Sequence, residues 1–253
     1  MKKSNYVFEN NKDNYLSETD KERGGRMTPR EAAALIDISA VRTQHTLKDI
    51  EEVFSYAKEY KFINVHVLPC WVSTLADMLK DVDGVYVGAP VGFPGGAHKT
   101  ETKIFEAKEL LKDGVQEMDI VMNIGKLKNK EYDYVLNELK SIVELAKGKA
   151  LVKVIIEINT LDDEEMFKAC DLVIESGADF VKTGTGWVPG PGGANIERIR
   201  KLKEHCGDRI KVKAAGGIRT KEEFMELVNM GVERMGINTK SAVDIVNALK
   251  EDV

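Results

Sequence analysis

Residues 151–182, LVKVIIEINTLDDEEMFKACDLVIESGADFVK, decide the fold class of this chain. A short run rich in Val and Ile at 151–156 precedes a charged segment with helical periodicity at 162–176, and a second short apolar run follows at 180–181. This order predicts a strand, a helix and another strand. Strands joined through a helix run parallel and need both faces of their sheet covered, which is typical of an α/β fold.

The same alternation continues over the whole chain from Thr28 onward. Short apolar runs predict eight strands, at 35–36, 63–68, 85–89, 118–122, 151–156, 180–181, 210–214 and 234–237. Segments with helical character follow them, at 47–60, 72–80, 99–112, 132–147, 162–176, 195–204, 221–230 and 241–249. Eight such units in about 225 residues match a (β/α)8 TIM barrel, whereas a doubly wound sheet usually has fewer strands. We therefore predict one barrel domain over 27–253.

Residues 1–26 have a different composition from the rest of the chain. They are rich in Lys, Asn, Asp and Glu and contain only scattered apolar side chains. We predict a polar N-terminal arm that is loosely ordered or docks through its few aromatic residues.

Composition and charge exclude several classes of protein. The 253 residues are 43% hydrophobic, and 37 Lys and Arg stand against 42 Asp and Glu, a net charge of −5 that offers no basic field for nucleic acid. No apolar run reaches the roughly 18 residues of a membrane span, and the N-terminus lacks a signal peptide. The cysteines Cys70, Cys170 and Cys206 are odd in number and far apart in sequence, so we expect no disulfide framework. These features predict a soluble, cytoplasmic protein.

A barrel of this type carries its chemistry at the carboxyl ends of its strands. The polar residues and glycines that end or interrupt the apolar runs are Asp37, His66, Asp119, Glu157, Lys182, Lys213, Gly216, Gly217 and Gly236. We take these as the candidate site residues.

Lys182 and Lys213 end neighbouring predicted strands, and glycine-rich loops follow both. If both point inward, their amines share a partly desolvated cavity. At a separation of about 4 Å and an effective dielectric near 20, the repulsion between the two charges is about 4 kcal/mol, which lowers the pKa of one amine by about three units. A neutral lysine can attack a carbonyl and form a Schiff base. The alternative is that they are surface lysines whose ammonium groups reach water. Lys153 and Lys211 also lie in strands, and their spacing does not assign them to a face.

Asp119 interrupts a run that otherwise belongs in a core. A buried carboxylate costs several kcal/mol unless it is paired, and an inward lysine is its natural partner. Asp119 could then carry protons through water between the Schiff-base intermediates, or it could be a structural ion pair only. Asp37 has the same two interpretations, and the structural one is favoured.

The glycines point to an anion. Gly216 and Gly217 precede a predicted helix and Gly236 lies near the end of the last strand, where such barrels usually bind phosphate, although glycine pairs also occur in plain turns. The loop 187–193 is either a mobile lid or a long connection. The histidines and cysteines have no metal-ligand spacing and no dinucleotide or ATP motif is present, so we expect no metal and no cofactor.

Seven motifs together resemble one family. They are LID at 35–37, VHVLP at 65–69, VGFPGG at 91–96, EMDIVMNIG at 117–125, KVIIE at 153–157, GADFVKTGTG at 177–186 and VKAAGGIRT at 212–220. Their order and their span of about 30–250 resemble the class I deoxyribose-phosphate aldolases.

The resemblance implies a TIM-barrel lyase of deoxyribonucleotide catabolism. Such an enzyme reversibly cleaves 2-deoxy-D-ribose 5-phosphate to acetaldehyde and D-glyceraldehyde 3-phosphate. Position by position, the resemblance implies that Lys182 forms the Schiff base, that Lys213 lowers its pKa and that Asp119 relays protons. It also implies phosphate contacts at Gly216, Gly217 and Gly236, and we add Thr183, Asn238 and Asp37 as expected substrate contacts.

The chain departs from the family pattern at several positions. Ile38 and Ser39 follow Asp37 where the family usually has His and Thr, His66 replaces a cysteine, and Gly184 replaces a serine. The usual Gly-x-Ser-Ser becomes GINTKS at 236–241, so Asn238, Thr239 or backbone N–H groups would replace lost hydroxyls. Some members use a C-terminal tyrosine that is missing here.

These departures keep two alternatives open. One is an aldolase of the same family with another phosphorylated sugar as substrate, and the other is a non-catalytic barrel that binds a phosphorylated metabolite. A small-molecule sugar phosphate is the expected partner in either case, and association into a homo-oligomer is left open.

Overall fold

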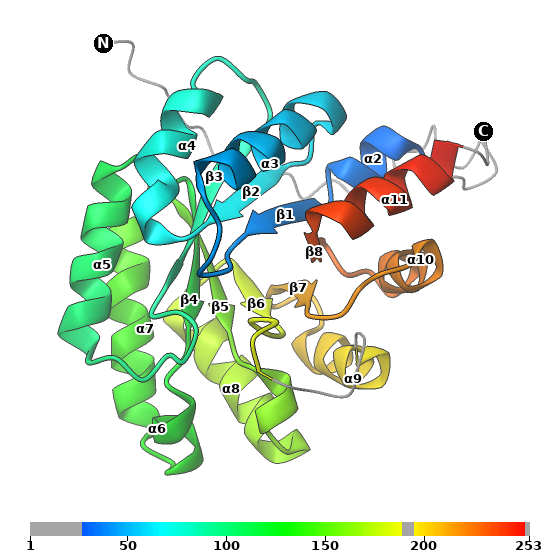
Figure 1. Cartoon of the computed structure of the whole chain (residues 1–253). Helices are drawn as coiled ribbons and strands as arrows, with labels where there is room; N and C mark the ends of the chain where they lie inside the picture. Colours follow the sequence, from blue (N-terminus) through cyan, green and yellow to red (C-terminus); the bar gives the residue numbers. More distant parts are fainter. Residues whose placement is uncertain (1–26, 189–194, 251–253) are drawn as a thin grey trace.

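A computed structural model describes residues 27–188 and 195–250 as a closed barrel of eight parallel strands surrounded by helices (Figure 1). The order of the strands around the barrel follows their order in the sequence. The predicted (β/α)8 architecture is therefore confirmed. The predicted arm at 1–26, most of the loop 187–193 and the chain end lie outside the described residues. Among the helices of the described part, none has the length and apolar character to cross a membrane.

The strands contribute short parallel segments of three to six residues. They are β1 (Ile36–Ala40), β2 (Asn64–Val67), β3 (Tyr86–Val91), β4 (Glu117–Val121), β5 (Leu151–Ile155), β6 (Phe180–Lys182), β7 (Lys211–Ala215) and β8 (Arg234–Asn238). The α-helices are α2 (Pro29–Ala33), α3 (Leu47–Tyr60), α4 (Val72–Leu79), α5 (Thr100–Lys112), α6 (Ile124–Lys128), α7 (Tyr132–Ala146), α8 (Asp163–Ser176), α9 (Ile196–Cys206), α10 (Lys221–Asn229) and α11 (Thr239–Lys250). Short 3₁₀ turns lie at Pro69–Trp71 and Ile158–Thr160.

Two features of this element list were not predicted. The helices α2 and α6 are five residues long, too short for an apolar periodicity to show, and each begins at a side-chain cap. The first strand, expected at 35–36, continues to Ala40 because its polar residues Asp37 and Ser39 alternate with apolar ones. These polar residues interrupt the apolar run, so the run is shorter than the strand.

Successive side chains of each strand point alternately to the surrounding helices and to the centre of the barrel. In β5, Val152 and Val154 are buried in the hydrophobic core on the face of the sheet that the helices cover. Lys153 between them is fully buried on the opposite face. The apolar core therefore lies between sheet and helices, and the centre of the barrel contains charged side chains. Lys153, whose face the sequence spacing did not assign, thus points to the interior of the barrel.

Helix α8 shows how local sequence sets the position of the next strand. The Asp162 carboxylate accepts a hydrogen bond from Glu165 N, and the Glu165 carboxylate accepts one from Asp162 N, which forms a capping box. The helix ends at Gly177, whose left-handed φ of +80° favours glycine. The chain then turns directly into β6, which carries Lys182.

Helices α8 and α9 bring two cysteines together. The Sγ atoms of Cys170 and Cys206 lie 2.8 Å apart, and both thiols are free and buried. The separation of the cysteines in sequence did not indicate that this pair would meet. One βα unit separates the two residues, so they occupy corresponding positions on neighbouring helices although they are 36 positions apart in sequence.

Candidate active site

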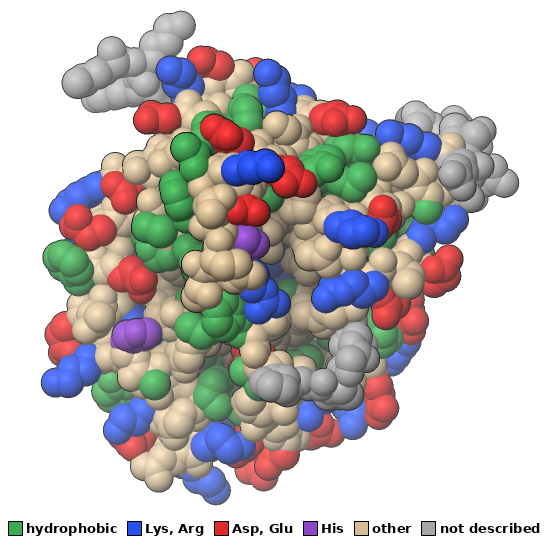
Figure 2. Space-filling view, in the orientation of Figure 1, with side chains coloured by type: hydrophobic (Ala, Val, Ile, Leu, Met, Phe, Trp, Pro, Cys, Tyr) green, Lys and Arg blue, Asp and Glu red, His purple; other side chains and the backbone are tan. Residues whose placement is uncertain are grey.

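A cavity of about 490 Å³ opens at the carboxyl ends of the strands. Residues from the ends of β1, β2, β6, β7 and β8 line it together with the loops that follow them. Figure 2 shows a hollow near the middle of this face, with Lys and Arg side chains and one His around it. The location agrees with the end of the barrel where the candidate residues were expected.

Lys182 and Lys213 are direct neighbours in the barrel wall. They are register partners on β6 and β7, so both side chains point to the interior. Each amine donates a hydrogen bond to the same oxygen of Asp119, Oδ2, at 2.7 Å from Lys182 Nζ and 2.8 Å from Lys213 Nζ. The Lys182 side chain is 11% exposed and that of Lys213 is 1% exposed. Lys182 is therefore the amine that a ligand in the cavity can reach.

A larger group of buried charges lies beneath this pair. Asp37 Oδ2 lies 2.6 Å from Lys213 Nζ, and Asp37 Oδ1 lies 2.7 Å from Arg234 Nη1. Glu117 contacts both Lys153 and Arg234. We call this set the buried charge cluster; its members are the carboxylates Asp37, Glu117 and Asp119 and the cations Lys153, Lys182, Lys213 and Arg234. Four cations face three carboxylates, so the fully ionised cluster has an excess charge of +1.

The pKa values reflect this crowding. Burial, with the charges of Lys182 and Lys153, lowers the pKa of the Lys213 amine to about 8 although Asp119 and Asp37 oppose the shift. The Asp119 carboxyl is also buried, which alone would raise its pKa, but its charged and polar neighbours hold that pKa well below the ordinary value. A lowered amine pKa was predicted for this pair of lysines. Burial is the main cause, and the repulsion between the two amines is a smaller contribution.

His66 of β2 completes the surroundings of Asp119. Its Nε2 atom lies 3.0 Å from Asp119 Oδ1, the oxygen that Lys182 and Lys213 do not share, and Lys153 Nζ lies 3.5 Å from the same Oδ1. Burial lowers the pKa of the imidazole to about 4, so His66 is neutral at pH 7.

Comparison with known proteins identifies the family. The family model of the DeoC/LacD family aldolases matches residues 24–239. The chain belongs to this family. It is 44% identical over 220 residues to the deoxyribose-phosphate aldolase of Rhizobium meliloti, covering 87% of this chain and 88% of the relative. The Enterococcus faecalis deoxyribose-phosphate aldolase is 44% identical over 209 residues, which cover 83% of this chain and 94% of that protein.

Solved structures agree with this membership. The deoxyribose phosphate aldolase from Aeropyrum pernix, described as a unique tetramer, has a TM-score of 0.81 at 29% identity and covers 94% of this chain and 98% of its own. An aldolase called QR15 has a TM-score of 0.79 at 37% identity, covering 87% and 96%. The resemblance noted in the sequence is confirmed.

The glycine that replaces the usual family serine has a structural reason. A Cβ atom at Gly184 would lie 2.8 Å from Glu157 Oε1. Glu157 has a left-handed φ of +49°, and its Oε2 accepts hydrogen bonds from Thr185 N at 3.1 Å and Thr185 Oγ1 at 2.5 Å. The Glu157 carboxylate thus holds the loop behind Lys182 and occupies the space next to Gly184.

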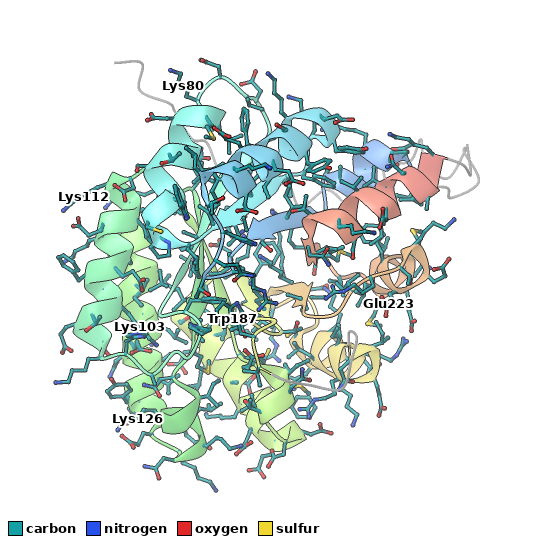
Figure 3. All side chains as sticks on the ribbon, viewed as in Figure 1. Lys80, Lys103, Lys112, Lys126, Trp187 and Glu223 are labelled. Carbon is teal, nitrogen blue, oxygen red and sulfur yellow. The ribbon has the colours of Figure 1, made fainter. Side chains whose placement is uncertain are left out.

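Three side chains meet across the opening of the cavity. Arg42 Nη2 donates a hydrogen bond to Gly186 O at 3.3 Å, and its guanidinium lies 5.2 Å from the centre of the Trp187 ring. The Phe93 and Trp187 rings meet edge to face at 5.5 Å. Figure 3 places Trp187 near the centre of the barrel, above the strand ends. These contacts join the loops after β1, β3 and β6.

The three glycines predicted to contact phosphate, Gly216, Gly217 and Gly236, all line the cavity but lie in different local structures. Gly216 and Gly217 have φ values of +92° and +103°, and the helix that follows begins only after its cap at Thr220. The predicted helix at 221–230 is therefore found as α10, and the two glycines lie in the turn that leads to it. Gly236 lies inside β8, where a Cβ atom would be 3.0 Å from Ala215 Cβ and 3.4 Å from Lys213 Cε. Glycine at 236 therefore leaves room for the Lys213 side chain.

Other expected substrate contacts are engaged in local structure. Thr183 Oγ1 donates to Ala215 O at 2.9 Å and accepts from Ala215 N at 2.8 Å. The Asn238 amide bonds to Ser241 N and Oγ, both at 3.0 Å, and so caps the start of α11. Thr239 Oγ1 is buried and has no hydrogen-bond partner among the described residues. Thr239 is therefore better placed than Asn238 to replace a lost serine hydroxyl.

Sequence reasoning missed two members of the buried charge cluster. Glu117 and Arg234 begin β4 and β8, two residues before Asp119 and Gly236. Because alternate residues of a strand share a face, the period of two was the signal that could have found them. Within 27–188 and 195–250, no group of three or more His, Cys, Asp or Glu is arranged to hold a metal ion.

Proposed function

We propose that this chain is a class I aldolase that reversibly cleaves 2-deoxy-D-ribose 5-phosphate to acetaldehyde and D-glyceraldehyde 3-phosphate through a Schiff base on Lys182. One observation carries the proposal: the amines of Lys182 and Lys213 share Asp119 Oδ2 at the base of a cavity. The names of relatives that are 44% identical support the choice of substrate.

The charge balance favours a neutral amine. Loss of one proton brings the buried charge cluster from an excess of +1 to neutrality, which reduces the cost of burying it. Both amines contact one oxygen, so this proton leaves from the Lys182–Lys213 pair as a unit. The remaining proton is better placed on Lys213, which contacts both Asp37 and Asp119. Lys182, with one carboxylate contact and access to the cavity, is left as the nucleophile.

The cleavage then follows from this arrangement. The Lys182 nitrogen attacks C1 of the open-chain sugar, and water leaves to form the iminium ion. The C3 hydroxyl loses its proton, the C2–C3 bond breaks toward the iminium, and D-glyceraldehyde 3-phosphate departs. The enamine takes a proton at C2, and water then releases acetaldehyde and restores Lys182. We assign the proton transfers to Asp119 and Lys213, acting through water.

The phosphate of the substrate has a suitable place near the last two strands. Gly216 and Gly217 lie beside the cavity, together with the start of the 12-residue helix α11 at Thr239. A helix N-terminus and backbone N–H groups attract an anion, and the unpartnered Thr239 hydroxyl adds a donor. We assign the phosphate end to these residues.

Borohydride trapping tests the proposal. Acetaldehyde or 2-deoxyribose 5-phosphate with borohydride should give a reduced adduct on Lys182, located by mass spectrometry of peptides. The variant Lys182→Met should give none, while Lys112→Met, which changes a lysine with a 70% exposed side chain, should label like the wild type. Folded wild-type protein without an adduct would refute the proposal.

A second candidate keeps the chemistry and changes the sugar. It is favoured by the engaged Asn238 amide at the phosphate end, where the family usually offers serine hydroxyls. Values of kcat/KM across a panel of sugar phosphates decide between the two candidates. A non-catalytic barrel would instead show ligand-dependent shifts of melting temperature and no turnover.

We also propose that the protein acts in the cytoplasm, in deoxyribonucleotide catabolism. The tetrameric Aeropyrum pernix relative supports a homo-oligomer as well, and light scattering coupled to size exclusion measures that state.

A further inference from the structure

The side of Asp119 that faces away from the two lysines meets the imidazole of His66. Oδ2 accepts the lysine hydrogen bonds, and Oδ1 lies 3.0 Å from His66 Nε2. Both His66 Nε2 and Asp119 Oδ1 are buried, and neither has a hydrogen-bond partner of good geometry among the described residues; the nearest other charge is Lys153 Nζ, 3.5 Å from Oδ1. Buried polar atoms are nearly always paired, so these two atoms are natural partners for each other.

The neighbouring strand is shaped to admit this imidazole. Gly88 of β3 is the register partner of His66. A Cβ atom at Gly88 would lie 2.4 Å from His66 Nδ1, 2.5 Å from His66 Cε1 and 2.5 Å from Asn64 Oδ1, closer than real carbon contacts. The ring can therefore occupy its position next to Asp119 only because residue 88 has no side chain. His66 and Gly88 act as a matched pair.

Burial keeps the imidazole uncharged although a carboxylate lies beside it. Asp37 on β1 lies 4.0 Å from Nδ1, Asp119 is on β4, and the cations Lys153 and Lys213 approach from β5 and β7. Burial has the largest effect and lowers the pKa to about 4, with the two lysines adding to it and Asp119 opposing it. A neutral imidazole can donate one N–H and leaves the balance of the buried charge cluster unchanged.

We propose that His66 is a positioning residue for the aldol reaction, donating from Nε2–H to Asp119 Oδ1 so that Oδ2 remains in contact with both lysine amines. The inference rests on the function proposed above. Both ring nitrogens are enclosed, with essentially no exposed surface, so they do not reach the substrate and His66 acts through Asp119. Without this bond the carboxylate can turn, and the oxygen that the two amines share is no longer fixed.

Three variants test the role of His66. His66→Leu removes the donor, and His66→Gln retains an N–H at the position of Nε2. Gly88→Ala leaves the chemistry of the ring unchanged but crowds both the ring and the neighbouring Asn64 Oδ1. We expect His66→Leu and Gly88→Ala to lower kcat by about 10- to 100-fold with little change in KM, since a hydrogen bond to a charged group is lost. His66→Gln should recover most of the activity. His98→Leu, on an exposed loop, is the control.

The pH profile distinguishes positioning from mere space filling. A hydrogen bond to the charged carboxylate favours its ionised form, so its loss in His66→Leu should move the acidic limb of the kcat profile to higher pH. An unchanged profile, or equal losses in His66→Leu and His66→Gln, would overturn the proposal, as would wild-type kcat in Gly88→Ala. If His66→Leu does not fold, the other two variants carry the comparison. An absent Lys182 adduct in the wild type defeats the proposed function instead, so the two failures are distinguishable.

Discussion

Replacing Asp119 with asparagine should destabilise the protein strongly. The substitution keeps the shape of the side chain but leaves the four cations of the buried charge cluster beside two carboxylates, because Asp37 and Glu117 remain. Three cations, Lys153, Lys182 and Lys213, lie within 3.5 Å of the lost carboxylate. Removing one partner of a buried ion pair typically costs about 3–5 kcal/mol. For a chain of this size that corresponds to a fall of about 6–20 °C in Tm.

Urea denaturation followed by circular dichroism at pH 7 and at pH 9 measures this loss. Part of it should be recovered at pH 9, since the crowded amines then give up a proton and the excess charge falls. Asp163→Asn is the matched control, because Asp163 pairs with Lys201 at 2.8 Å on the surface, where ion pairs contribute little. If Asp119→Asn were as stable as this control at pH 7, the idea that the cluster depends on its carboxylates would be refuted.

Three further predictions concern the same site. The free energy of unfolding of the wild type should rise by about 2 kcal/mol between pH 8 and pH 10. The pKa of about 8 at Lys213 marks the pH at which the coupled Lys182–Lys213 pair gives up its first proton, whereas the lysines of the unfolded chain still bind theirs; a flat urea-denaturation profile would contradict this. Lys213→Met balances the cluster at three charges of each sign, so its Tm should fall less than that of Asp119→Asn, while kcat should drop by about 10²- to 10⁴-fold; a larger fall in Tm would show that charge balance is not the controlling factor. Gly184→Ser should cost about 1–3 kcal/mol in thermal unfolding because its Cβ would lie 2.8 Å from Glu157 Oε1, and unchanged stability would mean that the Glu157 carboxylate moves freely.

The sequence was sufficient for the architecture because hydrophobic periodicity reports which residues are buried. Eight apolar runs and their helices predicted the barrel, and the positions of Lys182 and Lys213 followed once adjacent strands were assumed. The single oxygen shared by their amines could not be predicted, because side-chain geometry at the barrel centre depends on the register of strands far apart in sequence.

The missed features arise from the same limitation. Lys153 lies in a strand between two valines, and only the closed barrel shows that it points to the interior. Asn238 has the chemistry of a ligand contact, but a neighbouring helix start uses its amide first. The match between His66 and Gly88 likewise appears only when β2 and β3 are placed side by side.

A titration of the lysine side chains by ¹⁵N NMR tests the central idea most directly. The protein is labelled with ¹⁵N at lysine Nζ, and the variants Lys182→Met and Lys213→Met assign the two resonances. Their chemical shifts then show the pH at which the amine pair loses its first proton. We expect a transition near pH 8 that both substitutions abolish or move. Two resonances that both titrate above pH 10, like free lysine, would contradict it.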